Sequence, residues 1–256
     1  MKKIDETIFI TGVTGTIGKY FAKGLSSLGY KIIFTVRNKS TLKATEELLL
    51  KCGASYAKGI HADLENKNFI SKISKELSKH KLFPNILVNN ARNKEYLKPN
   101  KNGFVNRRCW HGEFLLDVIV PYELSMHLSS MNKSKLTKII NVASIYGVVA
   151  PQLSIYDNPL MDSSINYGTS KAALIHLTKE LAVRLASKEV KVNSISYGGI
   201  KGNEKDTLRK KYSNLTLSNR MMNKNEVFGA LKFLTSDESN YINGHNLLVD
   251  DGWTIK

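Results

Sequence analysis

Three residues in the second half of the chain carry side chains suited to proton transfer. Tyr167 and Lys171 stand four positions apart in the stretch NYGTSKAALIHLTKELA, so on a helix their side chains share one face. A free tyrosine is a poor base at neutral pH, but a neighbouring lysine ammonium favours the phenolate. Ser144 ends an earlier apolar run and offers a hydroxyl donor. Together they predict acid–base chemistry at a substrate oxygen.

A second chemical signal lies at the start of the chain, where TGVTGTIG places Gly12, Gly15 and Gly18 after an apolar run. A tight turn needs positive φ, and close approach of backbone to a pyrophosphate leaves no room for side chains. The N-terminus of the helix that follows offers unpaired N–H groups to an anion. Because the glycines stand between a strand and a helix, they predict a dinucleotide-binding turn.

Short β-branched runs alternate with amphipathic segments, which predicts a single α/β domain over residues 1–256 with a doubly wound parallel sheet. Strands are expected at residues 7–12, 31–36, 54–63, 85–91, 138–144, 191–196 and 245–250, and helices near 16–28, 40–52, 66–80, 112–131, 166–187 and 224–236. The irregular stretches 92–111, 145–165 and 198–222 all follow strands. In this architecture they should converge on the binding crevice as variable substrate loops.

The identity of the cofactor should depend on the end of the second strand, where an acid would bind the adenosine ribose of NAD. The sequence there is FTVRNKS, which has no acid but supplies Arg37 and Asn38. Arginine suits a 2′-phosphate through forked, charge-assisted contacts. NADP(H) is therefore the preferred cofactor, with NAD(H) as the alternative.

Composition excludes several classes of protein. The formal charge is +16, but the basic residues are spread over every segment without a basic helix or an arginine-aromatic motif, so nucleic-acid binding is not expected. Cys52 and Cys109 lack metal-ligand spacing, so no metal site is expected. No apolar run is long enough to span a membrane, and the N-terminus does not resemble a signal peptide. These features favour a cytoplasmic protein.

The chain resembles the short-chain dehydrogenase/reductase family over nearly its whole length. The matching pieces are TGVTGTIG, Asp63-Leu64, NNA at 89–91, Ser144, YGTSK at 167–171, VNSIS at 192–196 and INGHNLLVDDG at 242–252. The run SIYGVVAPQLSIYD is also similar to members of the family encoded in bacterial surface-glycan pathways, including flagellin glycosylation with sugars of the legionaminic acid type.

The resemblance implies a role for each matching position. Tyr167 would exchange a proton with the substrate oxygen, Ser144 would donate a hydrogen bond to that oxygen, and Lys171 would bind the nicotinamide ribose and favour the tyrosine phenolate. The remaining cofactor contacts are expected along the pyrophosphate, the adenosine and the nicotinamide: Gly12, Thr14, Gly15, Thr16, Ile17, Gly18, Arg37, Asn38, Asp63, Leu64, Asn90, Ala91, Gly199 and Ile200.

The sequence departs from the family pattern at several positions. Arg92 stands where the family usually has glycine, and either contacts a substrate anion or points to solvent. Ile119 aligns with the usual relay asparagine and cannot hydrogen-bond. Tyr197 replaces a proline, which makes it a candidate substrate contact or a sign of a less rigid nicotinamide site. The stretch between Ser144 and Tyr167 is longer than usual, as expected for a loop that adds substrate contacts.

Three functions remain open at this point. The first is an NADP(H)-dependent oxidoreductase acting on a carbohydrate-type substrate. An anionic substrate of this kind would suit the basic rim of the segment 200–222, which includes Lys201, Lys205, Arg209, Lys210, Lys211 and Arg220. The second is a 3-oxoacyl carrier-protein reductase, and the third is a cofactor-binding protein with weak turnover, favoured by Ile119 and Tyr197. The C-terminal segment resembles one that packs across subunits, which predicts a homodimer or homotetramer.

Overall fold

The computed structural model describes residues 5–256, and the expectation about the N-terminal segment, where it concerns residues 1–4, lies outside them. Within these residues, strands form one seven-stranded sheet in the order β3-β2-β1-β4-β5-β6-β7, and every pairing is parallel. The order reverses between β1 and β4, as in the doubly wound fold predicted from the sequence. The strands are Thr7–Ile10 (β1), Lys31–Val36 (β2), Tyr56–His61 (β3), Ile86–Asn89 (β4), Lys138–Ser144 (β5), Lys191–Tyr197 (β6) and Asn246–Val249 (β7).

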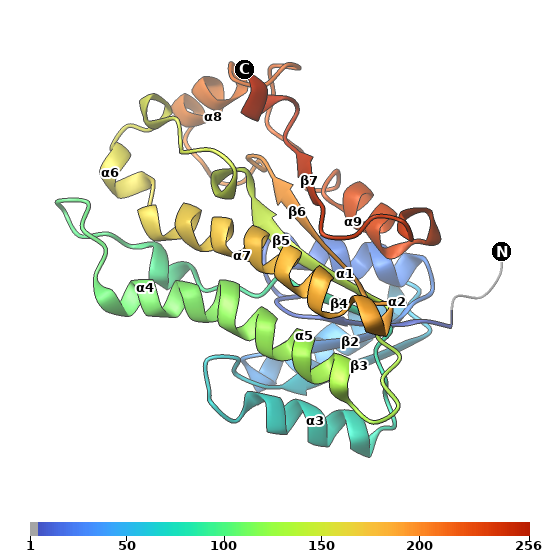
Figure 1. Ribbon diagram of the computed structural model, residues 1–256. Coiled ribbons are helices and arrows are strands. Elements are labelled where there is room, and N and C mark those ends of the chain that lie inside the picture. The colour runs from blue at the N-terminus through green and yellow to red at the C-terminus, as the bar shows by residue number, and fades with distance from the viewer. Residues whose placement is uncertain (1–4) are drawn as a thin grey trace.

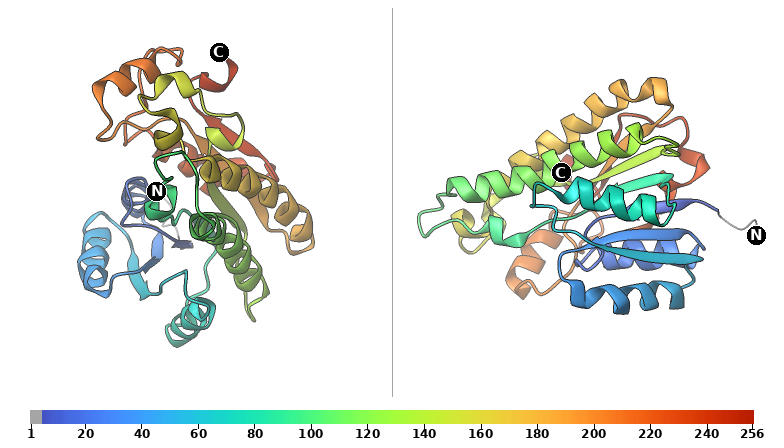
Figure 2. Two further views of the ribbon diagram at one scale, coloured as in Figure 1. Left: turned by 90° about the vertical axis from the view of Figure 1, so that its left-hand side faces the viewer. Right: turned by 90° about the horizontal axis from the view of Figure 1, so that it is seen from below.

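Helices cover both faces of the sheet, so the strand side chains pack alternately against one layer and the other. Phe9 packs with residues of α3 (Phe69–Lys79), α5 (Val120–Ser130) and α7 (Ile165–Arg184). Its neighbours Ile8 and Ile10 pack with α1 (Gly18–Ser27), α2 (Leu42–Lys51) and α9 (Phe228–Thr235). Figures 1 and 2 show these two helical layers on opposite sides of the strands. Burial on both sides explains why the central strands are continuously apolar.

The seven predicted strands are confirmed, with each end within two residues of its predicted position, but the predicted helix over 112–131 is not continuous. It begins earlier as α4 (Arg107–Phe114), widens into a π-helical turn over Leu115–Ile119, and continues as α5. Asn106 starts α4, because its side chain accepts the backbone N–H of Cys109 at 2.9 Å. Pro121 lacks the N–H that would bond the preceding turn, which explains the interruption.

Two stretches expected to be irregular contain helices. The stretch 198–222 includes α8 (Asp206–Ser213), and 145–165 includes the short α6 (Pro159–Asp162). Both lie with the C-terminus at one end of the molecule (Figure 1). No helix within residues 5–256 is long and apolar enough to cross a membrane.

Candidate active site

A cleft of about 930 Å³ lies beyond the carboxyl ends of the central strands. All three variable loops contribute to it, as expected: Arg92 and Lys94 come from the first, Tyr156 from the second, and Leu208 and Met221 from the third. Eleven of the predicted site residues line this cleft: Gly12, Thr14, Gly15, Thr16, Ile17, Gly18, Asn90, Ser144, Tyr167, Gly199 and Ile200. The glycine turn and the proton-transfer residues therefore belong to one site.

The glycine turn is shaped as a cradle. Gly12 has a φ of +71°, and a Cβ there would lie 2.8 Å from the Cα of Ala91. A Cβ on Gly18 would lie 2.0 Å from the Gly12 carbonyl oxygen. Since α1 begins at Gly18, the N-terminus of this helix lies directly after the turn. The residues present fit a pyrophosphate, which needs bare backbone and a helix N-terminus.

The side chain of Asn90 holds the glycine turn in place. Its amide nitrogen donates to the carbonyl oxygens of Thr11 and Gly12, at 3.1 Å in each case. The Thr11 hydroxyl in turn accepts the backbone N–H groups of Asn90 and Ala91, at 2.9 and 3.0 Å. The amide of Asn90 thus joins the end of β4 to the turn. Thr11 was missed from the sequence, although a hydroxyl residue directly before the turn was its signal.

The residues expected around the adenosine lie outside the cleft lining, just after β2 and β3. Arg37 Nη1 lies 3.7 Å from Glu65 Oε1, so a missed acid already faces this arginine. Asn38 accepts a backbone N–H two residues on, and Asp63 accepts the N–H of Glu65 at 3.1 Å. Leu64 is buried. β2 and β3 are neighbours with Val36 paired to His61, which brings these residues to one edge of the site.

The long gap between the strand end and the helix is closed by two glycines. The turn Ile145–Gly147 packs on the first turns of α7, and a Cβ on Gly147 would lie 2.7 Å from the carbonyl carbon of Lys171. A Cβ on Gly168 would lie 2.8 Å from the carbonyl oxygen of Tyr146. Only glycine permits backbones to approach so closely. The added loop leaves this contact intact.

The ring of Tyr167 is held between two neighbours. The guanidinium carbon of Arg92 lies 4.1 Å from the ring centroid, and the Tyr146 ring meets it edge-on at 6.5 Å between centroids. Ser144 is buried, and its hydroxyl accepts the backbone N–H of Tyr146 at 3.2 Å. Arg92 therefore does not simply point to solvent, since it lies over the tyrosine ring at the cleft, and contact with a substrate anion stays a prediction.

Lys171 forms a buried ion pair with Asp117, a residue that was not predicted from the sequence to belong to the site. Its Nζ donates to Asp117 Oδ1 at 2.8 Å and to the Val142 carbonyl oxygen at 3.0 Å, and lies 5.9 Å from the Tyr167 ring centroid. Asp117 and Lys171 are 2% and 6% exposed, whereas Ile119 is 46% exposed. The expectation that Ile119 occupies the relay position is therefore wrong. The interrupted helix turns Asp117 toward the lysine instead.

Tyr197 does not act as a free substrate contact. It is 4% exposed, and its hydroxyl donates to the carbonyl oxygen of Val227 at 2.6 Å. Its ring packs against Phe21 of α1, with 6.0 Å between centroids. Burial raises the pKa of its phenol above the ordinary range. This tyrosine fastens the end of β6 to the α1 and α9 side of the sheet, so its hydroxyl is not free to bind a substrate.

Glu113 is the most unusual group near the cleft. It is 1% exposed, and neither carboxylate oxygen has a hydrogen-bond partner. Its Oε1 lies 3.7 Å from Arg92 Nε. Burial and, second, repulsion by Asp117 raise the pKa of Glu113 to about 7, against the pull of Arg92 and Lys171. An acid in this state changes charge near neutral pH.

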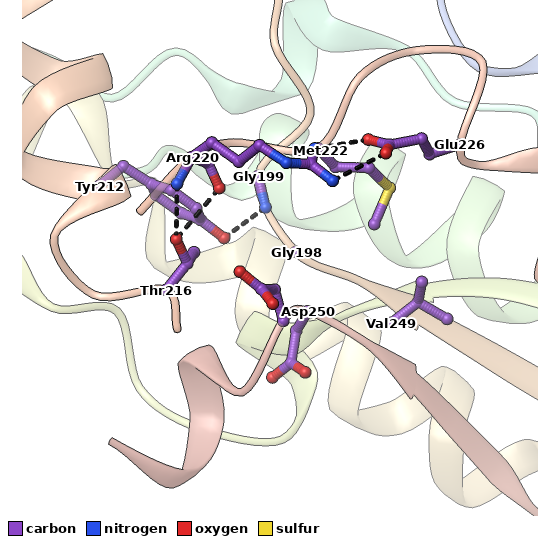
Figure 3. A pocket seen from close by; sticks show the side chains of 10 residues that line it. Gly198, Gly199, Tyr212, Thr216, Arg220, Met222, Glu226, Val249 and Asp250 are labelled. Atoms are coloured by element: carbon purple, nitrogen blue, oxygen red, sulfur yellow. Dashed lines mark hydrogen bonds and ion pairs between the residues drawn. The ribbon is translucent and has the colours of Figure 1, made fainter. Parts of the chain in front are cut away.

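The basic rim predicted on the segment 200–222, called the lid from here on, is largely neutralised by carboxylates. Asp157 lies 3.3 Å from Lys205 and 3.6 Å from Lys211, which ties the 145–165 loop to α8. Arg209 pairs with Glu204 and Asp206, and Arg220 pairs with Glu226. Figure 3 shows the Arg220 side chain directed at Glu226. These four cations serve contacts within the chain, so they do not present a free cationic rim.

Tyrosine side chains dominate the substrate side of the cleft. The hydroxyls of Tyr146 and Tyr156 lie 2.6 Å apart, and Tyr212 stacks on Trp253 at 5.8 Å. Tyr212 also accepts the backbone N–H of Gly199 (Figure 3), and lines a second pocket of about 220 Å³ behind the lid. Burial raises the pKa of Tyr212 to about 12. The wall is thus aromatic, with the hydroxyls of Tyr146 and Tyr156 bonded to each other and that of Tyr212 bonded to the backbone.

A family model described as enoyl-(acyl carrier protein) reductase matches residues 12–254. The 3-oxoacyl-[acyl-carrier-protein] reductase FabG of Buchnera aphidicola subsp. Acyrthosiphon pisum is 31% identical over 255 residues, which is 96% of each chain. The chain belongs to the short-chain dehydrogenase/reductase family. It is an oxidoreductase of that family, which acts on a hydroxyl or carbonyl group.

Other members of the family are similar in part or in structure. Post-translational flagellin modification protein A of Campylobacter coli is 39% identical over 123 residues, so the match spans about half of each chain, 48% in both cases. A short-chain dehydrogenase of Leptospira borgpetersenii solved with NAD⁺ is 28% identical, with a TM-score of 0.82 over 98% of this chain and 93% of that one. A 4-hydroxyisoleucine dehydrogenase complexed with NADH is 25% identical, with a TM-score of 0.83 over 98% and 100%.

The raised pKa of Glu113 predicts a pH-dependent cost to stability. Below the ordinary carboxyl pKa the group is protonated in both folded and unfolded chains, and stability falls as pH rises toward about 7, where the folded chain must lose the proton. Glu113→Gln removes this titration. Its free energy of unfolding relative to wild type should improve by about 2 kcal/mol between about pH 5 and about pH 8.

Urea unfolding at the two pH values measures this change. Glu47→Gln, at an exposed position of α2, is the matched control and should show no such trend. Parallel stability curves for wild type and Glu113→Gln would contradict the assignment of this titration to Glu113.

Proposed function

We propose that the protein is an NADP(H)-dependent oxidoreductase that transfers hydride between the nicotinamide and a hydroxyl or carbonyl group of a carbohydrate-type substrate. The substrate class includes sugars, sugar phosphates and nucleotide sugars, and the pathway is surface polysaccharide or flagellin glycan synthesis. The observation that carries the proposal is the hydroxyl-bearing aromatic wall beside Tyr167, formed by Tyr146, Tyr156 and Tyr212. Aromatic faces with polar edges suit polyhydroxylated rings.

The proton-transfer roles follow from the positions of three side chains. Tyr167, at the cleft surface, exchanges the proton with the substrate oxygen. Ser144 donates a hydrogen bond to the same oxygen, since its own hydroxyl proton is not used by the contact that it accepts from Tyr146. Lys171 supplies positive charge behind the tyrosine, and when the cofactor is bound the lysine would donate a further hydrogen bond to the nicotinamide ribose. When bound, the nicotinamide cofactor supplies the hydride chemistry.

The residues at the glycine turn support a dinucleotide. Gly12, Gly15 and Gly18, with Thr14, Thr16 and Ile17, would hold the pyrophosphate, because that backbone is bare and the helix N-terminus faces it. Asp63, Leu64 and Ala91 would flank the adenosine, and Gly199 and Ile200 the nicotinamide end. Asn38 and Asn90 would contribute backbone, since their side chains hold turns.

Arg37 supports NADP(H) over NAD(H). Its side chain is 66% exposed at the end of β2, where no acid stands to bind a ribose. Glu65 at 3.7 Å orients the guanidinium without a direct hydrogen bond. A 2′-phosphate would gain a forked, charge-assisted contact there. The two solved relatives described above carry NAD⁺ or NADH, so NAD(H) remains the alternative cofactor.

The relatives point to two substrate classes. The Campylobacter flagellin modification protein favours a glycan substrate, although it matches only half of the chain. The full-length similarity to the 3-oxoacyl carrier-protein reductases favours the second candidate, a reductase of acyl thioesters. Pairing of the lid cations weakens the basic rim for an acidic carrier protein and for an anionic sugar alike, so it does not rank the two classes. We place the carbohydrate substrate first because of the aromatic wall beside Tyr167.

The enzyme is further proposed to act in the cytoplasm as a homodimer or homotetramer. The support is the family, together with exposed apolar side chains that a second subunit would cover. Two of these side chains, Ile165 and Val183, lie on α7. The others lie near the C-terminus, at Phe233 of α9, Leu248 of β7 and Ile255. Burial of such side chains at an interface is favourable.

Substitution of Arg37 tests the choice of cofactor. Arg37→Glu should weaken NADPH binding by about 10- to 100-fold, because the 2′-phosphate loses a charged hydrogen-bond donor and meets an acid. NADH binding should change little. Titration of both cofactors by fluorescence measures this. Lys39→Glu makes the same charge change at an exposed position two residues on and should leave the ratio intact. An unchanged NADPH preference in Arg37→Glu would refute the role of Arg37.

A substrate panel tests the proposed substrate class. With NADPH or NADP⁺ at saturation, oxidised and reduced sugar phosphates and nucleotide sugars should give turnover at 340 nm. Acetoacetyl-carrier protein should give a kcat/KM at least about 100-fold lower, because aromatic faces with polar edges suit a polyhydroxylated ring better than an acyl thioester. The reverse ranking would establish the acyl reductase. Absence of turnover with every substrate, alongside tight cofactor binding, would contradict both.

A further inference from the structure

The stacking of Arg92 on Tyr167 has no counterpart in the usual glycine at this position. Arg92 follows β4, and its side chain is 28% exposed, so it lies partly enclosed at the edge of the cleft. Its guanidinium carbon lies 4.1 Å from the centre of the Tyr167 ring. On its other side, Nε lies 3.7 Å from the buried Glu113. Glu113 therefore positions the guanidinium, which faces the ring of Tyr167.

We propose that Arg92 is a positioning residue for Tyr167: anchored by Glu113, its guanidinium covers one face of the phenol ring and supplies a second cation that stabilises the phenolate. The inference rests on the proposed role of Tyr167 as the proton-exchanging group. Arg92, in the first variable loop, thereby shares the stabilisation of the phenolate that was expected of Lys171 alone.

The charges around the ring explain why a second cation matters. The Lys171 ammonium lies 5.9 Å from the ring centroid and is paired at 2.8 Å with Asp117, so its field at the tyrosine is partly offset. Arg92 is closer, and Coulomb attraction grows as distance falls. A planar guanidinium also stacks well on an aromatic face, and the attraction grows when the ring becomes more electron-rich, as in a phenolate.

The charged and aromatic groups around Arg92 and Glu113 come from three elements. Glu113 belongs to α4, Asp117 to the π-helical turn, and Tyr167 and Lys171 to α7. Glu113 has no hydrogen bond that would disperse its charge, and it is farther from Arg92 than a direct hydrogen bond requires. It therefore anchors the guanidinium by charge without a hydrogen bond. The two cations and two carboxylates balance when Glu113 is ionised, and one positive charge remains beside the ring when Glu113 is protonated, as its raised pKa of about 7 allows near neutral pH.

Tyrosine NMR on the free protein tests the proposal without any substrate. Tyrosine labelled with ¹³C at the ζ carbon reports the fraction of phenolate, and the Tyr167 signal is the one absent from Tyr167→Phe. In Arg92→Met, at a pH where wild type is partly ionised, the phenolate-to-phenol ratio of Tyr167 should fall about five-fold, as expected when the phenolate loses about 1 kcal/mol of cation–π stabilisation relative to the phenol. Arg92→Lys should recover most of it. Lys101→Met, an exposed cation of the same loop, should match wild type.

The outcomes separate electrostatics from shape. A phenolate fraction in Arg92→Met equal to wild type would overturn the proposal, and so would an Arg92→Lys value as low as that of Arg92→Met, because the charge would then be irrelevant. If Arg92→Met fails to fold, Arg92→Gln replaces it as a neutral side chain of similar reach. Because no substrate takes part, the result is independent of whether the carbohydrate or the acyl substrate proves correct.

Discussion

The buried ion pair between Lys171 and Asp117 is the contact on which the rest of the site depends. Two charges removed from water are stable only when their hydrogen bonds are completed. Asp117 accepts a second bond from Ser170 at 2.8 Å, and Lys171 donates a second one to the carbonyl of Val142 at 3.0 Å. The pair thereby joins α7, β5 and the helix that precedes β5. Any change in their relative position would leave a buried charge unpaired.

This constraint explains the local irregularities around the site. The π-helical turn Leu115–Ile119 presents Asp117 to the lysine, and Glu113 lies one turn before it on the same side of the sheet. The glycines at 147 and 168 let the chain after β5 lie directly on α7. A loop as long as 145–165 can then be accommodated, because its two ends are fixed by backbone contact and its middle is tied to α8 through Asp157.

The parts of the structure that follow from local pattern could be predicted from the sequence. β-branched runs gave the seven strands, and the glycine spacing gave the turn, because each depends on residues close in the chain. The partner of Lys171 could not be predicted in this way. A π-helical turn changes which residue faces the site. Comparison with the usual motif of the family therefore selected Ile119 instead of Asp117. The pairing of lid cations with Asp157, Glu204 and Glu226 likewise depends on tertiary placement, which charge counts do not contain.

Tyr197 is another residue whose side-chain contacts could not be predicted from the sequence. A tyrosine beside the cofactor site suggests a substrate contact, but its hydroxyl lies inside the core against Val227. Glu113 and Arg92 were separate residues in the sequence, and only the fold brings both to Tyr167. The site therefore combines a predictable set of reacting groups with a charged surround that the three-dimensional arrangement alone defines.

The central claim is that Tyr167 exchanges the proton with the substrate oxygen, and turnover by Tyr167→Phe tests it most directly. With the substrate identified and NADP(H) saturating, kcat should fall by about 100-fold or more while the affinity for NADPH stays close to that of wild type, because only the proton-transfer group is lost. Turnover equal to wild type would contradict the account.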